Sequence, residues 1–223
     1  MTRFWIVLSA AVALVGCASL APPAANDTPG APAEAPPPKI RDSRAAAYYY
    51  YTVAQMHARA GRVQDAIASL RQAIDRDPDT AGLWVQLSQW LARANEPAKA
   101  VEAAHKAIEL EPGNATPHLA LADIFRRQRR FADAEGELEK AIQLAPGSPD
   151  AYLALAQQDI ELRQFDKARA VLLRLVAIQP GSAQAQNLLG RAAIEGEQWD
   201  EAITRFKRAV EIDPDMDAAW MAL

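Results

Sequence analysis

The sequence has little of the material from which catalytic and metal sites are usually built. Its 223 residues include one cysteine and three histidines, and no two histidines lie at metal-ligand spacing. A single cysteine excludes an internal disulfide framework and a cysteine-based zinc site. There is no phosphate-binding glycine loop, no G-x-S-x-G elbow and no H-E-x-x-H pair. We therefore expect no catalytic residue, no bound metal and no cofactor, and a binding protein rather than an enzyme.

An excess of positive charge is also missing. The chain has 24 Lys and Arg against 28 Asp and Glu, a net charge of −4, whereas nucleic-acid binders usually show a basic excess. Aromatic residues make up only 7%, yet half of the residues are apolar and 23% are charged. That balance is enough to bury a core, so the chain as a whole is not disordered.

The longest apolar run is too short to span a membrane. It covers Phe4 to Val15, about a dozen residues against the roughly 20 that a spanning helix needs. Arg3 precedes it and small residues follow, which is the pattern of an export signal over residues 1–16.

The residues after this run resemble the lipobox of bacterial lipoproteins. They read Leu14-Val15-Gly16-Cys17 and contain the only cysteine. The resemblance implies cleavage before Cys17 and several acyl chains on it, which would anchor the chain stably where a single chain would not. Ala18, in place of Asp, implies an outer-membrane lipoprotein that faces the periplasm of the bacterial cell envelope. The alternative is an uncleaved leader in which Cys17 is an ordinary small residue.

Residues 17–43 form a Pro/Ala-rich linker that we expect to be disordered. Seven prolines lie between Ala18 and Lys39, with few large apolar residues. Such a segment favours the polyproline conformation and extends about 3.1 Å per residue. It is either a spacer that holds the rest of the chain away from the membrane or a plain tether.

The remainder of the chain has an internal period of 34 residues. Prolines mark the period at Pro78, Pro112, Pro146, Pro180 and Pro214. They define five units, numbered here 1 to 5, at 47–80, 81–114, 115–148, 149–182 and 183–216, with the start of a sixth at 217–223. A fourth-position residue repeats as Tyr50, Trp84, His118, Tyr152 and Gln186, and alanines repeat as Ala66, Ala100, Ala134, Ala168 and Ala202.

These spacings predict a pair of helices in each unit. Steps of three and four place the apolar residues on one helix face, small residues allow two helices to approach closely, and each proline stands where a second helix must stop. The pattern resembles the tetratricopeptide repeat over about three quarters of the chain. The resemblance implies an all-α fold, a right-handed α-solenoid of helix–turn–helix units over residues 44–223. His118, Gln186 and Asp159 depart from the family pattern. Asp159 stands at a usually buried position, which either fraying of the helix end or pairing with a neighbouring arginine would explain.

The resemblance also implies a concave groove lined by the first helix of each unit. Positions 2, 5, 9, 12 and 13 of each unit face such a groove in the family. The candidate partner-binding residues, called here the groove residues, are Tyr48, Tyr51, Gln55, Arg59, Gln89, Arg93, Asp123, Arg126, Arg127, Gln157, Glu161, Arg191 and Glu195.

We expect this groove to be basic along the first three units and acidic after them. Its basic part would receive an acidic or C-terminal segment of another protein. The alternative is that solvated positions simply favour long polar side chains. Tyr48 and Tyr51 are either anchors for a peptide or rings that cover the open end of the first unit. The carboxylate clamp of chaperone-binding relatives is absent, because Tyr51 and Gln55 stand in its place.

The sixth unit is only begun by residues 217–223. We expect Trp220 and Leu223 to occupy packing positions, and apolar surface to be exposed around Phe206 and Val210. Either the natural protein continues beyond Leu223, or a partner or a second copy covers this end.

The combined features suggest a non-catalytic scaffold for protein interactions. We expect a lipid-anchored adaptor or assembly factor for an envelope machine of the pilus-secretin or exopolysaccharide-export type. The alternatives are the N-terminal scaffold of a larger enzyme that continues beyond Leu223, and self-association through the C-terminal end.

Overall fold

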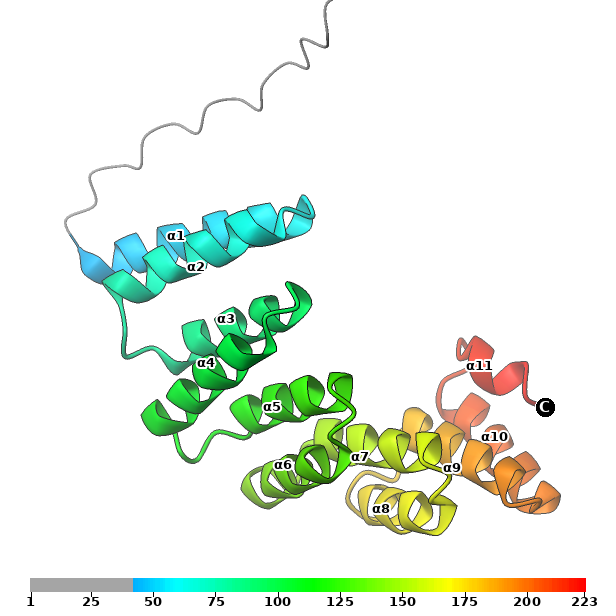
Figure 1. The fold of residues 1–223 in the computed structure, drawn as a ribbon. Coiled ribbons are helices and arrows are strands. Elements are labelled where there is room, and N and C mark those ends of the chain that lie inside the picture. Colours follow the sequence, from blue (N-terminus) through cyan, green and yellow to red (C-terminus); the bar gives the residue numbers. More distant parts are fainter. Residues whose placement is uncertain (1–41) are drawn as a thin grey trace, which may run out of the picture. The chain divides into compact units, whose positions relative to one another are not determined.

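The computed structural model describes residues 42–223, and this part of the chain is built from helices and loops (Figure 1). The predicted leader, Cys17 and almost all of the linker lie outside the described residues. The helices are α1 (Ser43–Arg59), α2 (Val63–Arg76), α3 (Ala81–Arg93), α4 (Pro97–Leu110), α5 (Ala115–Arg127), α6 (Phe131–Leu144), α7 (Pro149–Glu161), α8 (Phe165–Ile178), α9 (Ala183–Glu195), α10 (Trp199–Ile212) and α11 (Asp217–Trp220).

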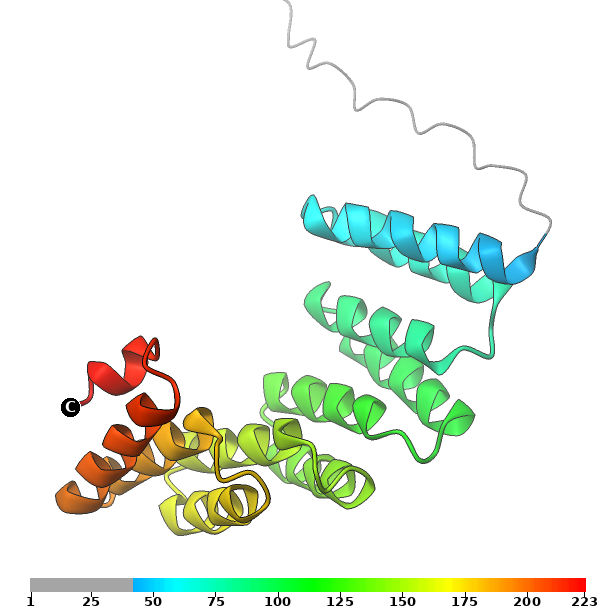
Figure 2. The same cartoon turned by 180° about the vertical axis from the view of Figure 1, so that it is seen from behind.

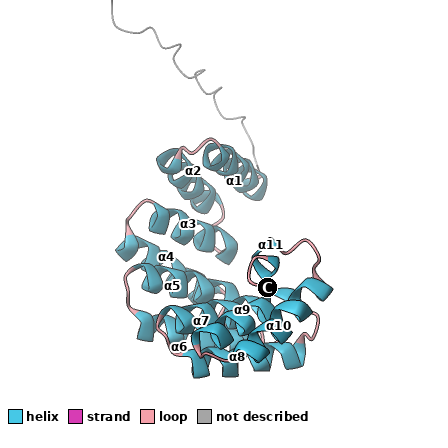
Figure 3. Cartoon of the chain, turned by 90° about the vertical axis from the view of Figure 1, so that its right-hand side faces the viewer, coloured by secondary structure: helices cyan, strands magenta, loops and turns pink. Residues whose placement is uncertain are grey.

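The helices pair in the order that the period predicts. Within each unit the first helix packs against the second, from α1 with α2 to α9 with α10, and each second helix packs against the first helix of the next unit. The hairpins therefore stack in chain order, as Figure 2 shows from behind and Figure 3 from the side. First helices also touch one another: α3 contacts α5, α5 contacts α7, and α7 contacts α9. The predicted helical solenoid is confirmed.

The turn inside each hairpin uses one recurring backbone conformation. Position 15 of each unit has a positive φ, between 58° and 73°: Gly61, Asn95, Arg129, Arg163 and Glu197. In each turn the N–H of the next residue donates to the carbonyl four residues before the left-handed one, as Arg62 does to His57. This bond satisfies a carbonyl that the end of the first helix leaves without a partner. The second helices then end two residues before the prolines, as predicted.

In units 2 and 4, the residue at the fourth position bonds the hairpin to the loop before it. Trp84 Nε1 donates to the carbonyl of Pro78 at 2.8 Å, and Tyr152 Oη donates to that of Pro146 at 3.1 Å. His118 occupies the same position, and its Nδ1 lies 2.6 Å from Glu137 Oε2 within its own unit. Replacing the usual ring with histidine therefore exchanges a bond between units for one inside a unit.

Ion pairs between units are confined to the later part of the array. Five of them join unit 3 to unit 4 or unit 4 to unit 5, at 2.8 to 3.6 Å: Arg126–Glu161, Lys167–Glu135, Arg174–Glu139, Arg163–Glu195 and Arg169–Glu201. Among the described residues, no ion pair joins unit 1 to unit 2 or unit 2 to unit 3. There the hairpins are held by apolar packing, in a cluster that runs from Ala54 to Ile124.

The C-terminal end differs from the prediction in two ways. Phe206 and Val210 are buried, at 1% and 9% exposure. They share a core cluster with Ala219 of α11, and Met216 packs against this cluster. The expectation of an exposed apolar surface there was wrong. Trp220 and Leu223, expected at packing positions, are instead 55% and 47% exposed. Trp220 still donates a hydrogen bond from its Nε1 to the carbonyl of Pro214 at 2.9 Å, as Trp84 does to the carbonyl of Pro78.

The close packing of unit 5 can be tested at Gly190. A Cβ added there would lie 2.7 Å from the ring of Phe206, which is itself buried. We expect Gly190→Ala to lower the free energy of unfolding by about 1–3 kcal/mol, as overpacked cores usually do. Thermal and urea unfolding followed by circular dichroism would measure this.

Gly136→Ala is the matched control, because a Cβ on that helical glycine meets open space. It should raise the free energy of unfolding by about 0.5–1 kcal/mol through helix propensity. Equal effects of the two substitutions would contradict the packing described for Phe206.

Candidate partner-binding face

All thirteen groove residues lie on first helices. Tyr48, Tyr51, Gln55 and Arg59 belong to α1, and the others follow on α3, α5, α7 and α9. None of them is buried: Tyr51, Gln55, Gln89 and Arg126 are half-buried, and the other nine are exposed. They are therefore accessible on a repeated face of the described chain.

One concave feature of the described residues involves two of these positions. A pocket of about 430 Å³, called here the tyrosine pocket, lies between units 1 and 2. Tyr48 and Tyr51 line it from α1, and Leu83 and Gln86 line it from α3. Arg44 stands near the start of α1, and the loop residues Asp77 and Thr80 complete the wall.

Two features of the sequence leave this pocket open. Gly82 lines it, and a Cβ at that position would meet nothing within 4 Å, so a side chain that could fill the space is missing. In addition, α1 and α3 do not pack together as α3 does with α5 or α7 with α9. The loop beside the pocket is held by Thr80, whose Oγ1 donates to Asp77 Oδ2 at 2.9 Å.

The structure pairs some of the predicted basic residues of the groove with acidic side chains. Arg127 bonds Asp123 at 2.8 Å, and Arg126 lies 3.6 Å from Glu161. These pairs neutralise much of the positive charge of unit 3, although such exposed pairs add little stability. In units 1 and 2, Arg59 makes no ion pair with a described residue, and Arg93 rests on the ring of Trp90 at 4.6 Å. At position 13, the arginines without a carboxylate partner among the described residues are therefore Arg59 and Arg93 of the first two units. Arg191, at position 9 of unit 5, also makes no ion pair with a described residue.

The acidic part of the predicted groove is neutralised as well. Glu161 pairs with Arg126, and Glu195 lies 3.5 Å from Arg163 in the turn of the preceding unit. The groove residues of units 4 and 5 at position 13 are acidic, as expected. Their charge is balanced by nearby arginines, so this part of the face has no local excess of negative charge from them. Sequence reasoning missed these partners because both pairs join residues of different units.

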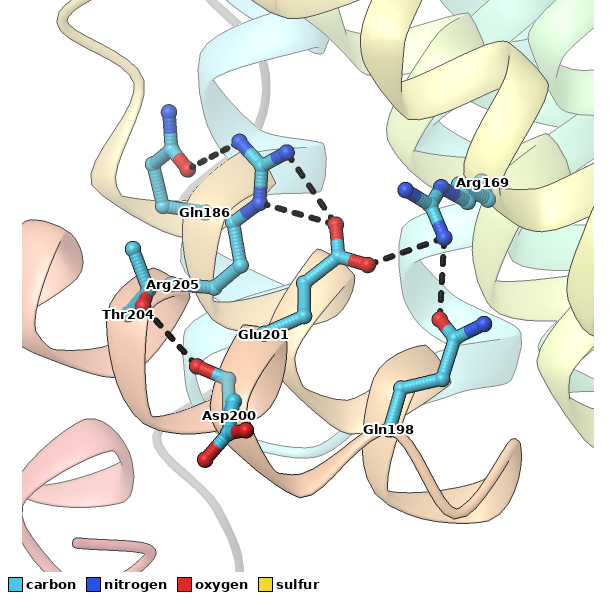
Figure 4. A network of polar contacts seen from close by, with 7 residues as sticks. All are labelled: Arg169, Gln186, Gln198, Asp200, Glu201, Thr204 and Arg205. Carbon is cyan, nitrogen blue, oxygen red and sulfur yellow. Dashed lines mark hydrogen bonds and ion pairs between the residues drawn. The ribbon is translucent and has the colours of Figure 1, made fainter.

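A second polar cluster is structural. Figure 4 shows Glu201 on α10 between two arginines, with Arg205 at 3.1 Å and Arg169 of unit 4 at 2.8 Å. Arg169 also donates to Gln198, and Arg205 to Gln186. Both arginines share the single carboxylate of Glu201, so the cluster joins units 4 and 5.

Asp159 is the most perturbed acid of the described chain. It occupies position 11 of unit 4, where units 2 and 3 have Leu91 and Phe125, and it is only 1% exposed. Its Oδ1 has no hydrogen-bond partner among the described residues. Burial raises the pKa of its carboxyl to about 6, with Glu135 adding to the effect and Lys167 opposing it. Of the two explanations that the sequence offers, pairing with an arginine does not occur among the described residues.

This carboxyl predicts a pH-dependent stability. Because its pKa when folded exceeds the ordinary value of 3.8, the folded chain holds the proton more tightly than the unfolded chain. Its contribution to the free energy of unfolding is therefore highest below about pH 4 and falls as the pH rises to about 6, by about 2–3 kcal/mol in all. We expect Asp159→Asn to raise the melting temperature by several degrees at pH 8 and by about half as much at pH 5.

Thermal unfolding at the two pH values would measure this effect. Asp150→Asn, an exposed carboxyl on the same helix, serves as control and should change the melting temperature equally at both pH values. A similar shift for Asp159→Asn at pH 5 and pH 8 would refute the assignment.

Comparisons with known proteins agree with this architecture. Sequence models described as tetratricopeptide repeat match residues 40–81, 51–115, 85–149, 125–192 and 184–215. Together these stretches cover the chain from residue 40 to residue 215. The chain belongs to the tetratricopeptide repeat family. Repeats of this family serve in protein–protein interaction, so the chain is a protein-interaction scaffold.

Several solved structures of tetratricopeptide repeat proteins share the fold. MamA is 23% identical with a TM-score of 0.61, covering 76% of this chain and 92% of its own. YrrB, a protein described as having an unusual peptide-binding site, is 19% identical with a TM-score of 0.57, covering 79% and 91%. TTC0263, a thermophilic protein of Thermus thermophilus, is 18% identical with a TM-score of 0.60, covering 79% and 97%. No curated protein matches the sequence.

Two further searches concern the described residues only. Over 42–223, no helix combines the length and the apolar character that crossing a bilayer requires. Within the same range, no cluster of three or more metal-ligating side chains occurs.

Proposed function

We propose that this tetratricopeptide repeat chain is a lipid-anchored adaptor of the bacterial cell envelope. Cys17 carries the acyl chains, and the helical units face the periplasm from the outer membrane. The units bind segments of other proteins and carry out no chemistry. The partners belong to an envelope machine of the pilus-secretin or exopolysaccharide-export type.

The observation that carries the adaptor role is the first-helix face of units 1 and 2. It combines an open pocket with two tyrosines and two arginines that have no carboxylate partner among the described residues. Arginine forms strong, directional bonds with carboxylates, and tyrosine supplies apolar contact area with a polar tip. Such a surface suits a protein segment with both apolar and acidic side chains.

The anchoring part of the proposal rests on the residues around Cys17. A branched apolar residue, a small residue and then cysteine follow the apolar leader directly. We expect the native protein to stay in the membrane fraction after a high-salt wash, and Cys17→Ser to abolish acylation in intact-mass spectrometry. Ser19→Ala, two residues away, should leave acylation and membrane retention unchanged. If the Cys17→Ser protein showed the same added mass as the native protein, acylation of Cys17 would be ruled out, and the anchor with it.

The adaptor role is tested by crosslinking the membrane-located protein and identifying what co-purifies. We expect a few envelope components that are lost when Arg59→Glu and Arg93→Glu are combined. Arg127 is less suitable for this test, because its reversal would place an acid beside Asp123, its present partner. Arg71→Glu with Lys207→Glu, two exposed basic residues on second helices that make no ion pair with a described residue, provides the control with the same change of net charge.

Recovery of copies of this chain alone would point to self-association in place of an adaptor. Recovery of no protein at all would refute the proposed function.

A further inference from the structure

We infer that units 1 and 2 recognise a short extended segment with a bulky apolar side chain and an acidic residue about four positions away from it. The apolar side chain enters the tyrosine pocket, and the acidic residue binds Arg59 and Arg93. This inference rests on the proposed function and names the chemistry of the partner.

The pocket sets the first element of this motif. Its volume of about 430 Å³ lies at the lower end of the range for ligand sites. The rings of Tyr48 and Tyr51 stand on one side, and Leu83, which is 7% exposed, forms part of the floor. Arg44 and Asp77, of opposite sign, both line the pocket, so it has no net charge that would favour a charged group. A large apolar side chain fits these surroundings better than a carboxylate.

The helix register sets the spacing. Tyr51, Gln55 and Arg59 follow one another at steps of four on α1, so they lie along one face of that helix. Eight residues of helix cover about 12 Å. An extended peptide covers that length in about four residues, at about 3.3 Å each. On α3, Gln86 lines the pocket, and Gln89 and Arg93 follow at steps of three and four toward the C-terminal end of the helix.

The side chains between the two ends suit a peptide backbone. Gln55 and Gln89 are half-buried and make no hydrogen bond with a described residue. Each side-chain amide offers both a donor and an acceptor, which is what a backbone carbonyl and N–H require. They bind the stretch between the apolar and acidic residues without specifying its side chains.

The unpaired arginines at position 13 place the acidic residue of the motif at units 1 and 2. Arg59 and Arg93 have no carboxylate partner among the described residues, whereas in unit 3 Asp123 already occupies Arg127. An acidic side chain therefore gains most at position 13 of the first two units, where it displaces no existing ion pair.

The inference is tested by selecting from a random library of displayed twelve-residue peptides with the full-length, detergent-purified chain as target. We expect enriched peptides to share an aromatic or large aliphatic residue separated by three to five positions from Asp or Glu. The most enriched peptide is then synthesised with a fluorescent label, and its Kd is measured by fluorescence anisotropy.

Variants at both ends of the motif decide the binding mode. Gly82→Phe places a ring in the pocket and should weaken binding at least tenfold, whereas Gly82→Ala adds only a Cβ into open space and should leave the Kd within twofold. Arg59→Glu with Arg93→Glu should also weaken binding at least tenfold, and Arg71→Glu with Lys207→Glu should not. Tyr48→Ser gives a second test of the pocket on a side chain that is 73% exposed and so is not needed for folding.

Three outcomes would overturn the inference, provided that circular dichroism shows the chain to be folded. In the first, the enriched peptides lack the apolar–acidic spacing. In the second, the Gly82→Phe or the Tyr48→Ser variant binds the selected peptide with an unchanged Kd. In the third, no peptide is enriched. If the crosslinked native protein still captured envelope proteins in that case, the adaptor role would stand and only the peptide motif would fall.

Discussion

The close approach of helices at a few alanine positions is the constraint on which the rest of this structure depends. Ala66, Ala100, Ala134 and Ala168 have no exposed surface, and each recurs 34 residues after the last. A methyl side chain lets two helices pack near enough for the leucines and rings around them to interdigitate at native density. Because the same contact is repeated, each unit meets its neighbour in a similar way and presents its first helix on the same side. The candidate binding face is a product of that repetition.

Much of the fold could be predicted because it depends on local chemistry. The 34-residue spacing of Pro78 and its equivalents indicated where second helices end, and the steps of three and four indicated which faces are apolar. The left-handed turn residues were harder to predict, since only Gly61 of the five is a glycine and Arg129, Arg163 and Glu197 give no local signal. The burial of Phe206 was missed because it depends on Gly190 and Ala219, which approach the ring from other helices.

The candidate site was less predictable, since its charge depends on side chains from several units. The pairing of Arg127 with Asp123 could have been found, because acid and base four apart on a helix commonly bond. The contact of Arg126 with Glu161 joins two different units and emerges only when the hairpins are stacked. The tyrosine pocket depends on the missing side chain of Gly82 and on the spacing of α1 and α3. Periodicity predicts where a residue faces, but not what lies opposite it.

The uneven distribution of ion pairs between units has a consequence for how the array loses its structure. In repeat proteins the free energy of each hairpin and that of each junction add along the chain, so a weaker junction marks where unfolding begins. Five ion pairs cross the junctions among units 3, 4 and 5. Among the described residues, units 1, 2 and 3 are joined by apolar contacts and by the hydrogen bond from Trp84 to Pro78, without an ion pair between units. Salt screens exposed charges and leaves apolar contacts intact. Ionic strength therefore acts differently on the two halves of the array. In dilute buffer, unfolding begins at the N-terminal hairpin. In concentrated salt, the ion pairs are screened, so the junctions between units become more nearly equal in stability.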